Sequence, residues 1–524
     1  MPATDCWSIY LEKAVPGSSD LEQAKHLIGA GRFEEASEIC RRLIAKDDHD
    51  EAVYLLAVIM GQTGLFSESR TLFERAIKNL PDRSDVTYNY GVVLNTMGKH
   101  EEAVKQWTRT LAVNPGHGDA IFNLGRAHAD SSAWKEAAEY FEHFLRLHPD
   151  KPRALLNLGN VHYRTGSWQP ARSYFQRIVT LDDSHVQGWI NLGLTEYRDG
   201  NPEVAIAHLR KALDLEPNNI NAHINIAQPL LSTGNMREGF AENEWRRKVQ
   251  DLSFPVTGQQ AWNGTDPIDR RILLYAEQGQ GDAIHFLRYV SILAERGASV
   301  RVYCHPSLTA LAKWVAGVES VDCFGDPPPE FDTYAPLMSL PHLLQLTDIE
   351  AAPPAPYIAP PASAALPGAP LSPRVGIAWA GNPEHEDDAN RTCPLTDLKP
   401  LIDNAPASFF SLQVGTASGE IDATGLARSI TDIGNNFRNF FDTAAAIQSL
   451  DLVISVDSAV AHLAGAIGKP VWLMLPRVPD WRWPRQGTET PWYPSMRLFR
   501  AVDDGDWSPV VAEMQSALAE NVAC

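Results

Sequence analysis

The feature that most constrains this chain is a pattern that returns every 34 residues. A Leu-Gly pair recurs at residues 124–125, 158–159 and 192–193. An alanine follows each of these glycines by twelve residues, and Gly91 and Ala103 extend the pattern toward the N-terminus. A second series closes the units, at Pro81, Pro115, Pro149 and Pro217, with Asp183 in one place. Proline cannot continue a helical hydrogen-bond ladder, so the pattern predicts stacked helical units with a helix end at each proline.

The pattern resembles the tetratricopeptide repeat (TPR), which implies two antiparallel helices per unit. In that family the small residue of the first helix meets the small residue of the second. We predict a TPR superhelix over residues 17–250 with about seven repeats, of which the first, over 17–49, is the weakest. The last unit departs from the pattern at Pro229 and Gly239, as expected where a solenoid is capped or docks. The run 244–247 that follows is a candidate docking surface.

An asparagine precedes the leucine of the first helix in successive units. The members of this row are Asn89, Asn123, Asn157, Asn191 and Asn225. An amide both donates and accepts hydrogen bonds, so a row of them on the inner surface could hold an extended peptide by its backbone. The O-linked N-acetylglucosamine transferases carry a similar row. The alternative is that each asparagine bonds only between neighbouring helices.

Length and charge set further limits. A chain of 524 residues is too long for one core, since single cores stop growing near ~250–300 residues. The net charge of −20 argues against a surface that coats nucleic acid. The six cysteines show no metal or redox spacing, and we find neither a signal peptide nor an apolar run long enough to span a membrane. These features predict a cytoplasmic protein without a bound metal.

The 34-residue period stops near residue 250, and alternating strand and helix patterns follow. Strands are predicted at 271–276 and 300–304, then at 375–379, 408–414, 452–456 and 471–475. Residues 351–373 are rich in Pro and Ala and are predicted to form a semi-rigid linker. The two α/β lobes therefore cover 262–350 and 374–515. Open α/β sheets bind ligands at the carboxyl ends of their strands, so a cleft between the lobes is the expected site.

Three motifs in these lobes resemble those of bacterial TPR-containing glycosyltransferases. The motifs are Gly-Gln-Gly-Asp-Ala-Ile from residue 279, Gly-Ile-Ala-Trp-Ala-Gly-Asn-Pro from residue 376, and Asp-Ser-x-x-x-His-Leu-Ala-Gly-Ala from residue 457. The catalytic half is similar to the lipopolysaccharide heptosyltransferases, and the architecture is similar to TPR-bearing flagellin glycosyltransferases. The resemblance implies a GT-B fold, a nucleotide-sugar substrate, no cofactor, and an inverting reaction that needs no metal. Protein groups must then stabilise the leaving phosphate.

Asp282 is the candidate catalytic base. It follows Gly279 and Gly281 in a turn between a strand and a helix, and the related enzymes have an aspartate in the matching Gly-Asp motif. The two glycines could instead bring backbone N–H groups close to a phosphate. The alternative role for Asp282 is that of a helix N-cap.

Asp457, Ser458 and His462 stand between a predicted buried strand and a helix. The first N–H groups of a helix are unpaired and carry positive potential, which favours an anion there. In the related enzymes this segment contacts the nucleotide, so the three residues are candidate donor ligands. The alternative is a plain N-cap at Asp457 with His462 on the helix flank.

Three further residues are candidate donor ligands. Asn382 and Arg391 lie on the loop after the strand at 375–379, and Gln413 lies at the end of the next strand. Arg391 could bind the leaving phosphate bidentately, although the acidic residues 386–388 make a surface ion pair an alternative. The aromatic segments 480–483 and 492–494 could line the acceptor channel, and packing between lobes is the favoured interpretation for them.

The leading hypothesis is a protein O-glycosyltransferase whose TPR arm captures the acceptor protein, with flagellin as one candidate. A second hypothesis is a TPR scaffold whose α/β half is not catalytic. A third is transfer to a glycan or a lipid-linked acceptor. Neither the donor sugar nor the acceptor can be read from the residues.

Overall fold

The computed structural model describes residues 20–249, 258–359, 361–368, 373–385 and 387–522. Residues 17–19 and 250 of the predicted repeat region lie outside this description, as do 360 and 369–372 of the predicted linker. The chain separates into two compact units, residues 1–195 and 196–524. We describe each unit by itself.

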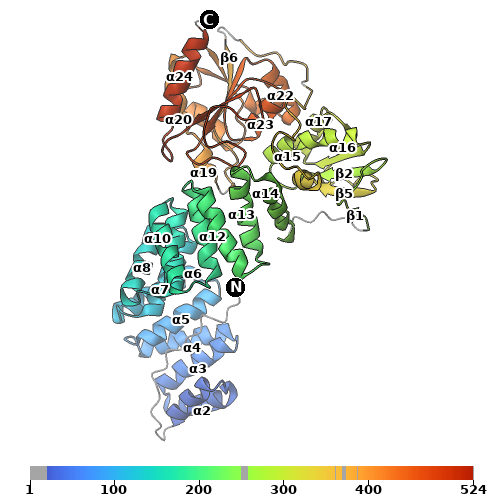
Figure 1. The fold of residues 1–524 in the computed structure, drawn as a ribbon. Helices are drawn as coiled ribbons and strands as arrows, with labels where there is room; N and C mark the ends of the chain where they lie inside the picture. Colours follow the sequence, from blue (N-terminus) through green and yellow to red (C-terminus); the bar gives the residue numbers. More distant parts are fainter. Residues whose placement is uncertain (1–19, 250–257, 360, 369–372, 386, 523–524) are drawn as a thin grey trace. The chain divides into compact units, whose positions relative to one another are not determined.

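The first unit is a stack of antiparallel helix pairs (Figure 1). Its described helices are α1 (Asp20–Gly29), α2 (Phe33–Asp47), α3 (Asp50–Gln62), α4 (Phe66–Asn79), α5 (Ser84–Thr96), α6 (His100–Val113), α7 (Gly118–Asp130), α8 (Trp134–Leu147), α9 (Pro152–Arg164), α10 (Trp168–Leu181) and most of α11 (Val186–Arg198). From α3 onward, the first helix of each pair begins 34 residues after the previous one. Helices α4, α6 and α8 each end two residues before the proline that closes their unit, as predicted.

The repeated glycine of the first helix lies against an aromatic ring of the second helix. A Cβ on Gly91 would lie 2.5 Å from Nε1 of Trp107, and one on Gly159 would lie 2.5 Å from Cε1 of Phe175. Gly125 lies in the same way against Phe141. The buried alanines Ala103, Ala137 and Ala171 are four residues before these rings. The glycine is therefore needed because the ring of the second helix fills the space that a side chain would take.

The turn between the helices of a pair needs one residue with left-handed backbone. The residue at this place is glycine in most units, with φ of +82° at Gly64 and +74° at Gly98. Ser132 takes the same place with a φ of +59°. Glycine adopts this conformation without steric cost, whereas a residue with a Cβ does not.

The second unit begins with the last repeats. It holds the end of α11, then α12 (Pro202–Leu215), α13 (Ile220–Ser232), α14 (Met236–Asn243) and the 3₁₀ helix η2 (Glu244–Lys248). Phe240 of α14 packs edge-on against Trp481 and Phe286, at centroid distances of 5.7 and 6.5 Å. Arg246 of η2 binds the buried Glu277 at 2.6 Å. The irregular last repeat thus shares a core with the α/β region, as its departure from the pattern predicted.

Two parallel sheets follow. The first has the order β1-β5-β2-β3-β4, with strands β1 (Gln260–Ala261), β2 (Arg271–Tyr275), β3 (Ser299–Cys304), β4 (Val318–Cys323) and β5 (Thr333–Pro336). All its pairings are parallel. Its helical segments are α15 (Gln280–Phe286), η3 (Leu287–Tyr289), α16 (Val290–Glu295), α17 (Pro306–Ala312), η4 (Leu337–Ser339) and α18 (Leu340–Leu343).

The second sheet has the order β11-β10-β9-β6-β7-β8 and is also parallel throughout. Its strands are β6 (Arg374–Ala378), β7 (Ser408–Ser411), β8 (Ile430–Asp432), β9 (Leu452–Val456), β10 (Val471–Leu475) and β11 (Met496–Arg500). Its helical segments are α19 (Asp388–Arg391), α20 (Leu395–Asn404), η5 (Thr416–Gly419), α21 (Glu420–Ala423), η6 (Gly434–Asn436), α22 (Phe440–Gln448), α23 (Ala459–Ala466) and α24 (Ser508–Val522). The strands predicted at 452–456 and 471–475 match β9 and β10.

The Pro- and Ala-rich segment between the sheets is packed at its centre, which differs from the expected linker. Tyr357 and Ile358 are buried, and their backbone N–H groups donate to the carbonyl oxygen of Ala466 in α23. Ile358 also forms an antiparallel bridge with Val315. Backbone bonds at Tyr357 and Ile358 therefore attach this run to α23 and to the segment after α17.

Candidate functional site

A cavity of about 900 Å³ lies at the carboxyl ends of strands from both sheets. Residues that directly follow β2, β3, β6, β7, β9 and β10 line it. The nine residues predicted as base or donor ligands all lie on its wall, namely Gly279, Gly281, Asp282, Asn382, Arg391, Gln413, Asp457, Ser458 and His462. Segments up to 183 residues apart in sequence thus meet at one site, as expected for parallel sheets whose strands end at the same edge.

Asp282 lies in the first turn of α15, and its carboxylate is paired. The N-cap of this helix is Gly279, so Asp282 is not the capping residue. Its Oδ1 accepts a hydrogen bond from Nη2 of Arg482, and 29% of its side chain stays exposed. Burial raises the pKa of Asp282, while the charge of Arg482 lowers it. The side chain is thus a partly shielded carboxylate on the cavity wall.

Arg482 and Asp480 complete this acidic-basic cluster. Nη1 of Arg482 donates to Oδ1 of Asp480 at 2.8 Å, and only 7% of the Arg482 side chain is exposed. The guanidinium also stacks over the ring of Trp481, 4.5 Å from its centroid. A cation held between two carboxylates and an aromatic ring is fixed in place.

The turn from β9 into α23 carries the second group of predicted ligands. Ser458, and not Asp457, takes the N-cap position, and its hydroxyl lies 3.0 Å from that of Ser455. Burial, with the nearby charge of Asp480, raises the pKa of Asp457 to about 6. Burial and the neighbouring Arg482 hold the pKa of His462 well below its usual value. His462 is therefore a neutral ring at the mouth of a helix whose first N–H groups face the cavity.

Gly281 brings α15 against α23. A Cβ on Gly281 would lie 3.2 Å from Cδ2 of His462 and 3.5 Å from Cα of Ala459. Any larger residue would push the first helix away from the start of the second. The glycine of the Gly-Asp motif is explained here by a contact between helices.

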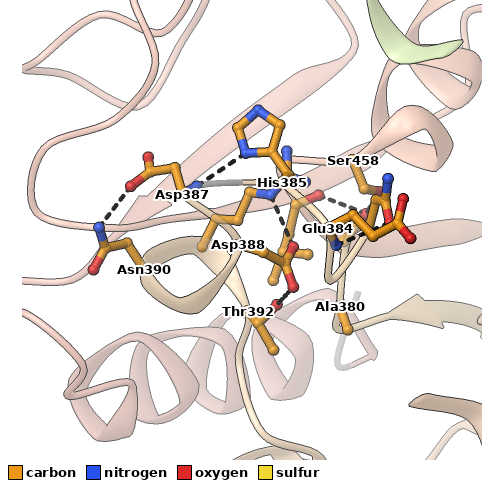
Figure 2. Close-up of polar contacts among 12 residues, drawn as sticks. Ala380, Glu384, His385, Asp387, Asp388, Asn390, Thr392 and Ser458 are labelled. Atoms are coloured by element: carbon orange, nitrogen blue, oxygen red, sulfur yellow. Dashed lines mark hydrogen bonds and ion pairs between the residues drawn. The ribbon is translucent and has the colours of Figure 1, made fainter. Parts of the chain in front are cut away.

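The loop after β6 forms another wall, and its polar side chains bind one another (Figure 2). His385 Nδ1 accepts from the backbone of Asp387 at 3.1 Å, and Asn390 donates to Asp387 at 2.6 Å. Asp387 also binds Arg198, at the end of α11, at 2.7 Å. The oxygen of Asn382 closes a turn by accepting from the N–H of Glu384 at 3.1 Å. The last repeats thus hold this loop in position.

Arg391 is the last residue of α19, and only part of its guanidinium group is paired. Its Nε donates to Asp388 at 3.1 Å, and among the residues described here its Nη1 and Nη2 have no recorded partner. A Cβ on Gly381 would lie 2.6 Å from Nη2, so the glycine makes room for the guanidinium. The ion pair considered in the sequence is present, and it leaves two nitrogens to bind an anion.

Gln413 lies on the cavity wall with its amide fully used. Its Oε1 accepts from the N–H groups of Trp379 and Ala380, both at 3.1 Å. Its Nε2 donates to the carbonyl oxygens of Ala380 and Val414, both at 3.2 Å. In this arrangement Gln413 positions the loop after β6, and direct contact with a ribose or base stays a prediction.

Several cavity residues were not singled out from the sequence. Tyr197, Arg198 and Gln228 come from the last repeats, and Arg438 and Asn439 precede α22. The oxygen of Asn439 caps α22 by accepting from Phe441 and Asp442. Asp480 and Arg482 stood within a segment noted for its aromatic residues. The sequence feature that could have indicated Arg482 is its place between two tryptophans. Both rings, Trp481 and Trp483, are buried, as the packing interpretation predicted.

The asparagine row of the repeats is bonded internally. Asn89 donates to the hydroxyl of Tyr54 in the preceding repeat at 2.8 Å, and Asn123 donates to that of Tyr88 at 3.4 Å. Asn191 donates to Asn160 at 2.8 Å. Asn157 donates to the carbonyl oxygen of Arg153 in its own helix. Asn225, the last of the row, is half-buried. The first three follow the alternative of bonds between neighbouring helices, and peptide binding by the row stays a prediction.

No group of three or more His, Cys, Asp or Glu side chains that could hold a metal ion is present in the described residues. In the same part of the chain, no helix combines the length and the apolar character that crossing a membrane requires.

Comparison with known proteins identifies the repeats. The tetratricopeptide repeat model matches residues 21–84, 61–107, 94–152, 122–186 and 156–220, so the N-terminal part of the chain consists of such repeats. Protein FlbA of Caulobacter vibrioides is 25% identical over 336 residues, covering 56% of this chain and 54% of that protein. The chain therefore spans about half the length of the curated relative that it matches.

Solved structures that resemble part of this chain include TPR proteins. YrrB, described as a TPR protein with an unusual peptide-binding site, is 20% identical, with a TM-score of 0.34, over 36% of this chain and 96% of its own. PilF of Pseudomonas aeruginosa is 19% identical, with a TM-score of 0.34, over 39% and 93%. A TPR protein of Cytophaga hutchinsonii is 17% identical, with a TM-score of 0.39, over 44% and 96%.

Proposed function

We propose that the α/β region is a GT-B glycosyltransferase that transfers a sugar from a nucleotide sugar to a Ser or Thr hydroxyl of a protein captured by the repeats. The observation that carries this proposal is the convergence of all nine predicted residues on one cavity at the strand ends of two parallel sheets. Two such sheets with a shared ligand site are what the motif resemblance predicts.

In this reaction the acceptor hydroxyl attacks the anomeric carbon of the sugar. A carbon–oxygen bond forms to the acceptor as the bond to the leaving phosphate oxygen breaks, which inverts the anomeric configuration. Asp282 takes the hydroxyl proton, because its carboxylate lies on the cavity wall and burial raises its pKa toward the working range. The nucleotide leaves with the bonding electrons and one added negative charge.

Other groups on the cavity wall would stabilise that charge. The first N–H groups of α23 and the two available nitrogens of Arg391 are suited to a phosphate. Arg482, which binds Asp282, adds a further fixed positive charge. Preorganised donors of this kind typically contribute a few kcal/mol each to transition-state stabilisation, of order 10²–10³ in rate.

The last repeats favour a protein acceptor over a glycan or a lipid-linked one. Tyr197, Arg198 and Gln228 belong to repeat helices and also line the cavity. TPR surfaces commonly bind extended peptides, so a peptide held on these repeats would reach the cavity without leaving the repeat surface. A scaffold without activity would need neither this continuity nor a carboxylate on the wall.

The test is transfer by the purified full chain. We would incubate it with hexosamine, heptose and nonulosonic acid nucleotide sugars and a protein recovered by pull-down, with flagellin as one arm, and measure acceptor mass. The proposal expects the acceptor to gain the mass of one sugar residue. The rate of transfer should fall at least 10²-fold in Asp282→Asn. It should be unchanged in the control Asp503→Asn, which alters an exposed aspartate outside the cavity. Donor binding without transfer to any protein would favour the scaffold or the glycan acceptor.

A further inference from the structure

A buried polar cluster joins the two sheets beneath the cavity. Tyr493, in the loop before β11, is fully buried, and its hydroxyl lies near Arg288 and meets three further polar groups. It lies 2.9 Å from Nδ1 of His462, 3.2 Å from Nδ1 of His285 and 3.4 Å from the hydroxyl of Tyr357. His462 lines the cavity and His285 does not. One phenol therefore links a cavity histidine to a core histidine.

The hydrogen bonds of this cluster are limited by the number of protons. The hydroxyl of Tyr357 donates to the carbonyl oxygen of Ile284 at 3.0 Å, so it has no proton left for Tyr493. A phenol holds one proton, which Tyr493 can give to only one partner. If one imidazole receives that proton at Nδ1, the other must donate its own Nδ1–H to the Tyr493 oxygen.

His285 has one ring nitrogen without a partner in either tautomer. Its Nε2 is buried and has no hydrogen-bond partner among the residues described. A proton on Nε2 would leave a buried N–H donor unpaired, which costs about 1–3 kcal/mol. With its proton on Nδ1, His285 donates to Tyr493 and leaves an unpaired acceptor at Nε2 instead, so this ring alone does not set the direction. In that tautomer Tyr493 donates to His462, which is the shorter of the two contacts.

The surroundings of His462 decide which imidazole donates. Its Nε2 lies 3.6 Å from Oδ1 of Asp457, where an N–H is attracted by the carboxylate and a lone pair is repelled. Trp483 stacks on the ring at 5.4 Å and 22°, and Gly281 lies against its Cδ2 edge. Packing thus holds the orientation of the ring, and the Tyr493 hydroxyl sets its tautomer.

We propose that Tyr493 is a positioning residue that fixes His462 as the Nε2–H tautomer, so that the cavity receives a neutral N–H donor for an oxygen of the bound ligand. That the ligand is a nucleotide sugar rests on the proposed function, whereas the tautomer does not. The low pKa of His462 agrees with this role, because the ring then gives a hydrogen bond and not a proton.

The first test reads the tautomer in the unmodified protein. The full chain would be labelled with ¹⁵N-histidine, and the His462 signals assigned by their loss in His462→Gln. Two-bond ¹H–¹⁵N spectra at pH 7.5 distinguish a protonated from an unprotonated ring nitrogen. We expect His462 to show a protonated Nε2 and a bare Nδ1. A proton on Nδ1 would overturn the proposal, whether or not the protein transfers a sugar.

The second test removes the hydroxyl in Tyr493→Phe and uses Tyr357→Phe as the matched control. The control deletes a phenol of the same cluster that donates to a carbonyl oxygen and not to a histidine. In Tyr493→Phe we expect both tautomers of His462 to be populated, and in Tyr357→Phe an unchanged His462 spectrum. We also expect the Kd for ADP or UDP, by calorimetry, to rise about five-fold in Tyr493→Phe alone.

The outcomes separate the two proposals. A folded Tyr493→Phe protein with the wild-type His462 spectrum overturns the positioning role. If this variant does not fold, the spectrum of the unmodified protein decides. The expected spectra without sugar transfer by the wild-type chain would support the role of Tyr493 and contradict the proposed function.

Discussion

Arg482 donates a hydrogen bond to Asp282 from 200 residues further along the chain. The same guanidinium binds Asp480, so one arginine holds two carboxylates at the cavity wall. The contact joins the loop after β10 in the second sheet to the first turn of α15 beside the first. It therefore links the candidate base to the lobe that carries the candidate donor ligands.

We expect Arg482→Gln to lower the free energy of unfolding by about 2–3 kcal/mol. Removing one partner of a buried ion pair typically costs about 3–5 kcal/mol. Asp282 and Asp480 each keep 29% of the side chain exposed, so water can solvate them once Arg482 is lost. The expected loss of stability is therefore smaller than for a fully buried pair. Urea unfolding of Arg482→Gln, Asp282→Asn and the double variant gives the coupling energy. We expect about 1 kcal/mol or more for this pair and less for the exposed pair Arg374–Asp451. Additive effects at Asp282 and Arg482 would contradict the structure.

The pKa of Asp457 predicts a stability change with a definite sign. Its folded-state pKa of about 6 lies above the value near 3.9 of an unfolded chain. The stability that this difference contributes is present below about pH 4 and lost as the pH rises through 6. Asp457→Asn keeps the group neutral, so it should stabilise the protein at pH 8 by about 2–3 kcal/mol and by less at pH 5.

The control for this effect is Asp451→Asn. Hydrogen bonds from Arg374 lower the pKa of Asp451, so its contribution is present at neutral pH and lost on acidification. This variant should destabilise the protein at pH 8. Melting temperatures at the two pH values check both signs. A loss of stability at pH 8 in Asp457→Asn would show that its carboxylate is not penalised by burial.

Gly381→Ala should displace Arg391. The new Cβ would lie 2.6 Å from both Nη2 of Arg391 and Oδ1 of Asp388, so the guanidinium must move. A lost charge-assisted hydrogen bond is worth about 1.5–3 kcal/mol, so we expect the Kd for ADP or UDP to rise about ten-fold or more. Calorimetric titration measures this. Gly419→Ala is the control, since its Cβ would meet no atom within 4 Å. Equal affinities in both variants would remove Arg391 from the anion site.

Opposite substitutions at equivalent turns of the repeats should have opposite effects. Gly98 has a φ of +74° with open space around a new Cβ, so Gly98→Ala introduces backbone strain of about 1–2 kcal/mol. Ser132 already has a φ of +59°, and Ser132→Gly relieves that strain. Thermal unfolding should show a lower midpoint for Gly98→Ala and a higher one for Ser132→Gly. A shift in the same direction for both would mean that the turn is not held in left-handed geometry.

Much of the architecture could be read from the residues because it depends on local patterns. The 34-residue period predicted the helix pairs and their ends, since helix breaking by proline acts on its own turn. The apolar runs predicted β9 and β10 with their bounds. The motif residues predicted a shared site, because parallel strands end at one edge of a sheet. Each of these inferences needs only short-range rules.

The contacts that decide the chemistry join residues far apart in sequence, so no local pattern reports them. Only the tertiary structure places Arg482 on Asp282, Tyr493 between two histidines and Tyr357 in a buried segment that reads as a linker. It also bonds Asn89 to Tyr54, where the sequence shows only a regular row. The sequence by itself indicated nine of the residues that line the cavity. Their charges, tautomers and partners depend on burial and on distances of about 3 Å, which exist only in the folded chain.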